Sequence, residues 1–447
     1  MSYTAAIQQL SAMVPELYTR PGQARRKFSL DEIRVLLGAL GDPHRRFRSV
    51  LIAGTNGKGS TAFTLASILA KAGIRTGLYT SPHLEQVNER IRVGGVLIED
   101  EDFARQYFVV QEAAGRLVEN GRLEQFPSFF ETITAMAFLH FAERGVEIAV
   151  LEVGMGGRLD ATNVVDPVLS VITDISLDHT EWLGSTIAEI AREKAGILRE
   201  GGTLIVLPQH PEANRVIGEA VEKLGVRAVS AAQFVPARGD HGEEFRVSVL
   251  GQEIGLSYSL VGDHQKRNMA LAVAAAEELA WNQGVALDAR DIALGVRRLV
   301  WPGRLEQFVE HHGDREEIKW VLDVAHNPAG AWALRAALSA ADNSAAARTL
   351  VFSCLRDKPV AEMAQILFPL FDEVIFAPIQ SPRATPTEEL LAAARATGTP
   401  GAVVDSVAEA IERAAQLSPF GTVVVTGSVY LVGEARPLIR ARIGARG

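Results

Sequence analysis

Cysteine is nearly absent from this sequence of 447 residues, which contains one, Cys354. A single thiol cannot form an internal disulfide or a thiolate metal cage, so we expect a protein of the reducing cytoplasm. The sequence also lacks any run of about 18 apolar residues, and we therefore expect no membrane-spanning helix. Its N-terminus has no basic stretch that leads into an apolar segment, and this predicts no signal peptide.

Positive charge is outnumbered, because 45 Lys and Arg residues face 54 Asp and Glu residues and give a net charge of −9. An acidic chain is a poor non-specific ligand for nucleic acids, so we expect neither nucleic acid nor membrane as a partner. A composition of 47% hydrophobic and 22% charged residues is that of a globular protein and excludes a fibre or a disordered chain. The length favours two or three domains.

From about residue 48 the sequence repeats a pattern of apolar strand, Gly-rich turn and helix. This pattern is typical of α/β proteins and predicts a doubly wound, mostly parallel sheet. A tight hairpin is expected over 91–98, around Gly94 and Gly95, and a small antiparallel appendage over 244–260. The expected strands of the first sheet are 49–53, 74–80, 148–153, 168–173 and 203–207.

Trp301-Pro302-Gly303 interrupts the pattern, and we place a domain boundary there. The sequence therefore predicts a larger N-terminal P-loop domain over 1–300 and a smaller Rossmann-like α/β domain over 304–447. Two Ala-rich stretches, near 344–347 and 392–395, are expected to be helix surface. The expected strands of the second domain are 319–323, 349–353, 373–377, 402–404 and 422–426.

The strongest chemical motif lies between the first strand and the first long helix of this pattern. Its glycines allow backbone N–H groups to surround phosphates, the helix adds its positive end, and Lys58 can reach the terminal phosphates. The spacing departs from the usual phosphate loop, because Gly59 stands between Lys58 and Ser60. The alternative is a Gly-rich turn with a surface lysine. The residues of the loop are Gly54, Thr55, Asn56, Gly57, Lys58, Gly59, Ser60 and Thr61.

Two further strands end near residue types that bind metals. Glu152 directly follows one strand, and Asp178-His179 comes shortly after the next. Ligands bind at the carboxyl ends of the strands in open α/β sheets, so we expect Glu152 and His179 at the same edge as the phosphate loop. With phosphate oxygens they can form an Mg²⁺ or Mn²⁺ shell. A capping carboxylate and a hydrogen-bonded loop histidine are the alternatives.

Lys194 falls on the apolar stripe of a helix that follows Ser185. A desolvated lysine loses basicity, and its neutral amine can react with CO₂ to form a carbamate that ligates metal. Alternatively, the stem of Lys194 is buried while its ammonium reaches water, and the residues alone favour this second reading. Another helix begins with a capping box at Ser128-Phe129-Phe130-Glu131, for which a structural role is sufficient.

Six segments taken together resemble the bacterial folylpolyglutamate synthase/dihydrofolate synthase family of the Mur-ligase superfamily. They occur in family order, and the resemblance covers nearly the whole chain. The phosphate loop is shared by Mur-type ligases, whereas the second and third segments are more specific to the folate branch. The segments are Gly54–Ser60, Thr80–Leu84, Glu152–Asn163, Leu177–Thr180, Arg192–Ile197 and Asp323–Pro328.

The resemblance implies an enzyme that uses ATP to join L-glutamate to a folate or dihydropteroate carboxylate. It implies that the phosphate loop holds ATP, together with Asn268, Arg304 and Asp323. Magnesium, in two sites, would be held by Ser81, Glu152, His179 and a carbamylated Lys194. The implied substrate residues are His326 and Ser428 near glutamate, and Ser128, Phe129, Phe130, Glu131, Leu159, Asp160 and Ala161 near dihydropteroate.

Two rival functions remain at this stage. A peptidoglycan-type Mur ligase shares the phosphate loop, but the Ser81-Pro82-His83 and Gly156-Gly157-Arg158 segments argue against it. A P-loop regulatory ATPase without ligation would hydrolyse ATP independently of glutamate and folate. Nucleotide motifs on both sides of the boundary predict that the C-terminal domain closes over ATP. We expect a monomer, because no long apolar heptad run is evident.

Overall fold

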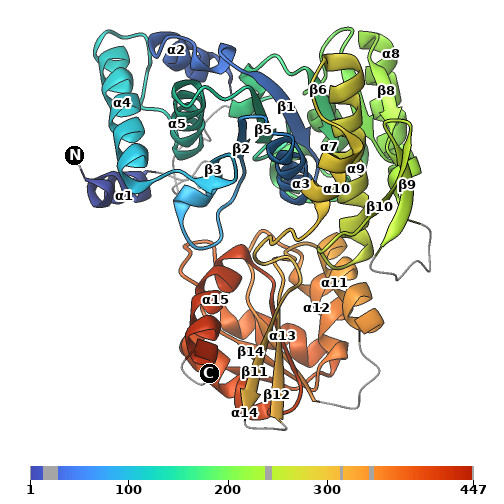
Figure 1. The fold of residues 1–447 in the computed structure, drawn as a ribbon. Helices are drawn as coiled ribbons and strands as arrows, with labels where there is room; N and C mark the ends of the chain where they lie inside the picture. Colours follow the sequence, from blue (N-terminus) through green and yellow to red (C-terminus); the bar gives the residue numbers. More distant parts are fainter. Residues whose placement is uncertain (1, 14–28, 237–243, 313–315, 342–346, 445–447) are drawn as a thin grey trace.

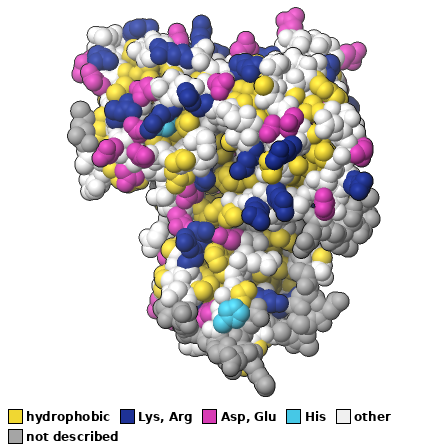
Figure 2. Space-filling model, in the orientation of Figure 1, with side chains coloured by type: hydrophobic (Ala, Val, Ile, Leu, Met, Phe, Trp, Pro, Cys, Tyr) yellow, Lys and Arg dark blue, Asp and Glu magenta, His cyan; other side chains and the backbone are white. Residues whose placement is uncertain are grey.

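The computed structural model describes residues 2–13, 29–236, 244–312, 316–341 and 347–444. Two bodies are stacked in Figure 1, each built on its own sheet, and the chain passes from the upper to the lower body near residue 300. Basic and acidic side chains are intermixed over the face shown in Figure 2, and the outline narrows where the bodies meet. No helix among the described residues is both long and apolar enough to span a bilayer.

The upper body contains an eight-stranded sheet with the order β4-β3-β2-β5-β1-β6-β7-β8. Six neighbouring strands are parallel: β2, β5, β1, β6, β7 and β8. At the other edge, β3 pairs antiparallel with β2, and β3 and β4 form the hairpin expected at Gly94. The doubly wound prediction is therefore confirmed. The strands are β1 (Arg48–Ala53), β2 (Thr76–Tyr79), β3 (Ile91–Val93), β4 (Val96–Leu97), β5 (Ile148–Glu152), β6 (Leu169–Ile172), β7 (Thr203–Val206) and β8 (Arg227–Ser230).

Helices cover both faces of this sheet because its central strands are apolar on both sides. In β1, Val50 and Ile52 pack into one core with α3, α9 and α10, and Leu51 and Ala53 pack into another core with α2, α4 and α5. The helices are α1 (Tyr3–Ala12), α2 (Asp31–Ala39), α3 (Lys58–Lys71), α4 (Asp100–Glu119), α5 (Phe129–Glu143), α6 (Thr180–Leu183), α7 (Ile187–Ala195), α8 (Pro211–Leu224), α9 (Asp263–Gln283) and α10 (Ala289–Val296).

The expected antiparallel appendage over 244–260 is also present. It consists of β9 (Phe245–Val249) and β10 (Gln252–Leu256), which pair with each other outside the main sheet. Phe245, Val247 and Val249 alternate toward the core that holds α3 and α9, which explains the alternating pattern in the sequence.

The lower body contains a six-stranded sheet with the order β11-β12-β16-β13-β14-β15. All its strands are parallel except β11, which the sequence analysis missed. Of the Ala-rich stretches, 392–395 lies in a helix, α13, as expected, but Ala394 is buried in the core and is not on the surface; 344–346 falls outside the described residues. The elements are β11 (Glu306–His312), β12 (Glu316–Leu322), α11 (Pro328–Ala341), β13 (Arg348–Phe352), α12 (Val360–Leu367), β14 (Glu373–Phe376), α13 (Thr387–Thr397), β15 (Gly401–Val403), α14 (Val407–Leu417), β16 (Thr422–Thr426) and α15 (Val429–Gly444).

The segment that joins the two bodies is attached to the upper one at Trp301. The indole ring stacks on Phe63 of α3 with ring centroids 4.4 Å apart. Arg92 of β3 lies over the same indole, 5.3 Å from its centroid. This joining segment is thereby held against the helix that follows the phosphate loop.

Candidate active site

The phosphate loop connects β1 to α3, as the sequence predicted. At Gly57 the backbone has φ of +87°, a left-handed conformation that glycine adopts at little cost. A Cβ at Gly57 would lie 2.2 Å from Oδ1 of Asn268, so a side chain there would displace the Asn268 amide. The loop and Asn268 of α9 therefore lie close together.

Gly59, which departs from the usual phosphate-loop spacing, has a physical explanation in the structure. A Cβ at this position would lie 3.2 Å from Oε2 of Glu152, at the end of β5. The same Oε2 accepts a hydrogen bond of 3.0 Å from the backbone N–H of Ser81, which follows β2. The tips of β1, β5 and β2 thus meet at one point, where burial raises the pKa of Glu152 and the charge of Lys58 opposes the rise.

Two lysine amines lie against the backbone of the loop. Nζ of Lys58 donates to the carbonyl of Thr55 at 3.1 Å, and Nζ of Lys194 donates to the carbonyl of Gly54 at 2.6 Å. Lys194 is only 3% exposed, so its ammonium does not reach water as the alternative reading supposed. Burial, aided by the charge of Lys58, lowers the pKa of Lys194 to about 7.

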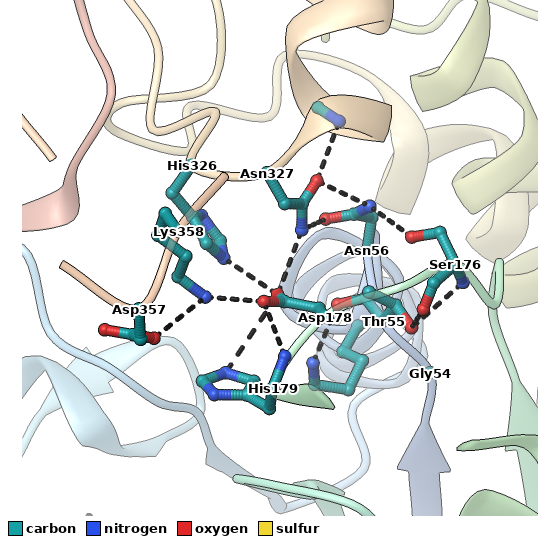
Figure 3. Close-up of polar contacts among 12 residues, drawn as sticks. Gly54, Thr55, Asn56, Ser176, Asp178, His179, His326, Asn327, Asp357 and Lys358 are labelled. Atoms are coloured by element: carbon teal, nitrogen blue, oxygen red, sulfur yellow. Dashed lines mark hydrogen bonds and ion pairs between the residues drawn. The ribbon is translucent and has the colours of Figure 1, made fainter. Parts of the chain in front are cut away.

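Asp178 is the centre of a polar cluster between the two bodies (Figure 3). Its carboxylate accepts hydrogen bonds of 2.5 Å from Nζ of Lys358 and 3.0 Å from Nδ2 of Asn327. Nε2 of His326 lies 3.5 Å from the same group. Burial alone would raise the pKa of Asp178, but hydrogen bonding from His326 and the charge of Lys358 hold it far below its usual range.

His179 and Asn56 extend this cluster on the side of the upper body (Figure 3). His179 is the N-cap residue immediately before α6 and has φ of +50°, and burial lowers the pKa of its imidazole to about 4 despite the charge of Asp178. The side-chain amides of Asn56 and Asn327 donate to each other at 3.2 and 3.0 Å. A residue of the phosphate loop is thus bound directly to the lower body.

These groups surround a cavity of about 500 Å³ at the carboxyl ends of the strands. Ser428 does not line it; the Ser428 hydroxyl is buried and accepts a hydrogen bond from the backbone N–H of Tyr430. The predicted residues that line the cavity are Gly54, Thr55, Asn56, Gly57, Lys58, Gly59, Ser60, Ser81, Glu152, His179, Lys194, Asn268, Arg304, Asp323 and His326.

A second cavity, of about 130 Å³, adjoins the first and shares Met155, Gly156 and Leu183 with it. It is lined by five of the residues predicted for dihydropteroate: Phe130, Glu131, Leu159, Asp160 and Ala161. Ser128 and Phe129 are absent from its lining. Ser128 instead forms the predicted capping box with Glu131, whose carboxylate accepts from the Ser128 N–H at 2.8 Å.

Several residues of the site were not predicted from the sequence. Asn327 and Asp178 were inside recognised segments, but no role was assigned to them. Lys358 gave no signal, because its partner Asp178 lies 180 positions away. His264 and Arg267 also line the cavity, and Arg267 donates to Asp174 at 2.8 Å. Their position at the start of α9, close to Asn268, was the signal that could have found them.

The site also offers donors for a hard cation. In the part of the chain that the structure describes, no group of three or more His, Cys, Asp and Glu side chains is arranged to hold a metal alone. Glu152 nevertheless presents a carboxylate beside the phosphate loop, and Ser81, which carries a hydroxyl, lines the same cavity. This donor set fits magnesium, which keeps several waters and binds through one or two carboxylates together with substrate phosphates.

Comparison with known proteins agrees with this geometry. Residues 52–276 match the Mur ligase middle domain, and residues 303–429 match the Mur ligase, glutamate ligase domain. The chain is 35% identical over 428 residues to the dihydrofolate synthase/folylpolyglutamate synthase of Bacillus subtilis, with 93% of this chain and 95% of the relative covered. The chain belongs to the folylpolyglutamate synthase/dihydrofolate synthase family.

Two solved structures of this family share the fold over nearly the whole chain. One is the Mycobacterium tuberculosis folylpolyglutamate synthase complexed with ADP and AMPPCP, with a TM-score of 0.85, 33% identity and 98% of each chain covered. The other is Escherichia coli FolC in complex with DHPP and ADP, with a TM-score of 0.83, 30% identity and 99% and 98% covered. The resemblance deduced from the sequence is therefore confirmed.

Proposed function

We propose that this protein is an ATP-dependent ligase that forms an amide between L-glutamate and a folate carboxylate. One observation carries the proposal: a cavity lined by the phosphate loop and by residues of the C-terminal body adjoins a smaller cavity that contains Phe130 and Asp160. The larger cavity suits a nucleotide, and the smaller one suits a flat aromatic ring system. Relatives have been solved with ADP and with DHPP, which supports this division.

For ATP, we propose that the loop from Gly54 to Ser60 holds the phosphates and that Lys58 neutralises their charge. Asn268 contacts the loop from α9. Arg304 and Asp323 come from the C-terminal body, and Asp323 is fixed because it accepts hydrogen bonds of 2.9 Å from the N–H groups of Leu305 and Ala325. Both bodies therefore contribute to the proposed nucleotide site.

For magnesium, we propose that Ser81, Glu152 and His179 hold one ion and that a carbamylated Lys194 serves a second. Bound magnesium neutralises phosphate oxygens and stabilises the charge that develops during phosphoryl transfer. The depressed pKa of Lys194 supports carbamylation, because only the neutral amine attacks CO₂. The nitrogen forms a bond to carbon and loses a proton, which leaves an anionic carbamate.

The chemistry requires an activated acid, because a carboxylate is a poor acceptor for an amine. In the proposed reaction a substrate carboxylate oxygen attacks the γ-phosphorus of ATP, ADP leaves, and an acyl phosphate forms. Lys58 and the N–H groups of the loop offset the repulsion between these anions. The glutamate nitrogen then attacks the acyl carbon, phosphate leaves, and the nitrogen loses a proton. His326, which lines the cavity, is the candidate base.

We propose tetrahydrofolate polyglutamylation as the main activity and the conversion of dihydropteroate to dihydrofolate as a second one. The residues that line the smaller cavity support the second activity, and Ser128 contributes by capping α5. We further propose domains over 1–300 and 304–447, a monomeric protein and a cytoplasmic location. Ser428 is retained as a residue near the glutamate, held by its buried position beside α15.

One incubation series tests the function. ATP, Mg²⁺ and glutamate are supplied with either tetrahydrofolate or dihydropteroate, and the products are weighed by mass spectrometry. We expect the mass to increase by whole glutamyl residues with tetrahydrofolate and by one with dihydropteroate, with ADP release dependent on glutamate. Lys58→Ala serves as the inactive control. ADP release that ignores both glutamate and folate would instead support the regulatory ATPase.

A further inference from the structure

The loop that follows β2 leaves the active site and enters the C-terminal body. We define the Ser81 loop as residues 81–86. It begins at Ser81, whose N–H donates to Glu152, and three residues later Leu84 packs against the C-terminal core that contains Val324 and Val432. One short loop thus joins the proposed magnesium site to the other body.

The contact at Leu84 is close. A Cβ at Gly433 of α15 would lie 2.0 Å from the carbonyl oxygen of Leu84 and 3.8 Å from its Cδ1. A Cβ at Gly303 would lie 3.4 Å from Cδ2 of the same leucine. Only glycine at 433 allows the loop backbone to approach α15 in this way, because any larger residue would push the Ser81 loop out.

The Ser81 loop is held rigidly, so a displacement at one end reaches the other. The carboxylate of Glu89 accepts from the N–H groups of Leu84, Glu85 and Gln86 at 2.8, 2.9 and 2.9 Å. Nε of the buried Arg90 donates to Nδ1 of His83 at 2.9 Å. These bonds fix the backbone from Leu84 to Gln86 and the imidazole of His83, while the bond from the Ser81 N–H to Glu152 fixes the other end of the loop.

A second contact ties the same loop to the C-terminal body. Arg436 of α15 pairs with Glu85, and it also donates to Glu306 of β11 at 2.7 Å. Arg436 is only 13% exposed at its side chain, so this pair is partly shielded from solvent. The loop is therefore bound to α15 at two places, at Gly433 through Leu84 and at Arg436 through Glu85.

We propose that Leu84 is a positioning residue: its contact with Gly433 sets the place of Ser81 beside Glu152. The nucleotide site then gains its full affinity for magnesium only while the C-terminal body is docked on the loop. This inference rests on the proposed function for the assignment of Ser81. It goes further in naming the contact through which the second body acts on the metal site.

Calorimetric binding of AMPPCP, measured in Mg²⁺ and again in EDTA, tests the inference without turnover. The ratio of the two affinities is the gain from Mg²⁺. We expect Leu84→Ala and Gly433→Ala each to lower this gain by about 10-fold, the scale seen when residues that orient metal ligands are removed. In the Ser81→Ala background, Leu84→Ala should change it by less than about twofold, because the effect passes through Ser81. Leu84→Met should restore the gain.

Ile411→Val is the matched control, because Ile411 is buried in the same C-terminal core on α14. It should leave the gain unchanged at a comparable loss of thermal stability. Gly433→Ala improves helix propensity, so a weaker helix cannot explain its effect. The inference alone is overturned if Leu84→Ala keeps the full gain from Mg²⁺. It is also overturned if Ile411→Val lowers the gain as much as Leu84→Ala does, or if Leu84→Ala lowers the gain as much in the Ser81→Ala background as in the wild-type protein. A wild-type protein with no gain from Mg²⁺ overturns the proposed nucleotide site as well.

Discussion

Lys194 donates to the Gly54 carbonyl from a buried position on α7. Its amine therefore lies against the phosphate loop, although the residue is far from that loop in the sequence. We predict that Lys194→Ala abolishes turnover, because the proposed carbamate is lost. Short-chain carboxylates added to this variant should restore part of the activity, measured as ADP release with glutamate and folate present. The exposed Lys71 on α3 provides the control, and Lys71→Ala should remain active. Full activity in Lys194→Ala would remove the carbamate from the mechanism.

The same amine predicts a pH dependence of stability. Its pKa is about 7 in the folded protein, against an ordinary value of 10.5 for an unfolded chain. Between these values the unfolded chain holds a proton that the folded protein lacks, so raising the pH favours folding. Below about pH 7 both states carry the proton and the contribution is constant. We therefore expect the urea midpoint of the wild-type protein, compared with that of Lys194→Met, to rise between pH 7 and pH 10 in CO₂-free buffer. If the midpoints of the two proteins change with pH in the same way, the lowered pKa of Lys194 is contradicted.

At the scale of elements, the turn from β1 into α3 depends on the conformation of Gly57. We predict that Gly57→Ala lowers turnover on the order of 100-fold, because its Cβ would displace Asn268 and the loop. Gly73 is the matched control: it also has a positive φ, of +77°, and nothing lies within 4 Å of a Cβ there. Both variants should lose about 1–2 kcal/mol of stability from backbone strain. Equal turnover in the two variants would show that the Asn268 contact is unimportant.

The elements that the sequence predicted share strong local patterns. β1 and β5 each contain four consecutive apolar residues, and α3 has its apolar residues at helical spacing between two glycines. The missed strands lack such signals: β8 is largely exposed, and β11 contains charged and histidine residues because its edge position leaves one side unpaired. The cluster around Asp178 was missed for a different reason. Its members come from loops that follow different strands. A contact between residues 180 positions apart leaves no local pattern in the sequence.

At the scale of the whole molecule, the pair of Asp178 and Lys358 joins the two bodies. Both side chains are buried, at 8% and 3% exposure, so removing Asp178 leaves the buried Lys358 ammonium with only the longer contact to Asp357, at 3.7 Å. We predict that Asp178→Ala costs about 3–5 kcal/mol in urea unfolding and that the double variant with Lys358→Met recovers much of this loss. Breaking the half-exposed pair of Arg413 and Glu373 should cost about 1 kcal/mol or less. Equal costs for the two pairs would contradict the importance of burial.

Closure of the C-terminal body over ATP stays a prediction. Arg304 and Asp323 reach the cavity from that body, so ligands that bind between the bodies should bring them closer. We expect small-angle scattering to show a smaller radius of gyration once ATP, Mg²⁺ and folate are added. Lys58→Ala should not respond to the same additions. An unchanged profile in the wild-type protein would mean that the bodies are already in their working arrangement.

The stacking of Trp301 on Phe63 divides the connection between the bodies into two unequal parts. Residues 297–300 precede the stacked ring and are secured at both ends, by α10 and by the indole. The Gly303 carbonyl accepts from the Val324 N–H at 3.0 Å and the Leu305 N–H donates to Asp323, so both residues are fixed to the C-terminal body. The pivot of any swing is consequently confined to the short stretch between Trp301 and Gly303, where Gly303 has φ of +69°. Residues inserted before Trp301 should form a surface loop and have little effect on turnover. The same insertion after it would move Arg304 away from the proposed nucleotide site.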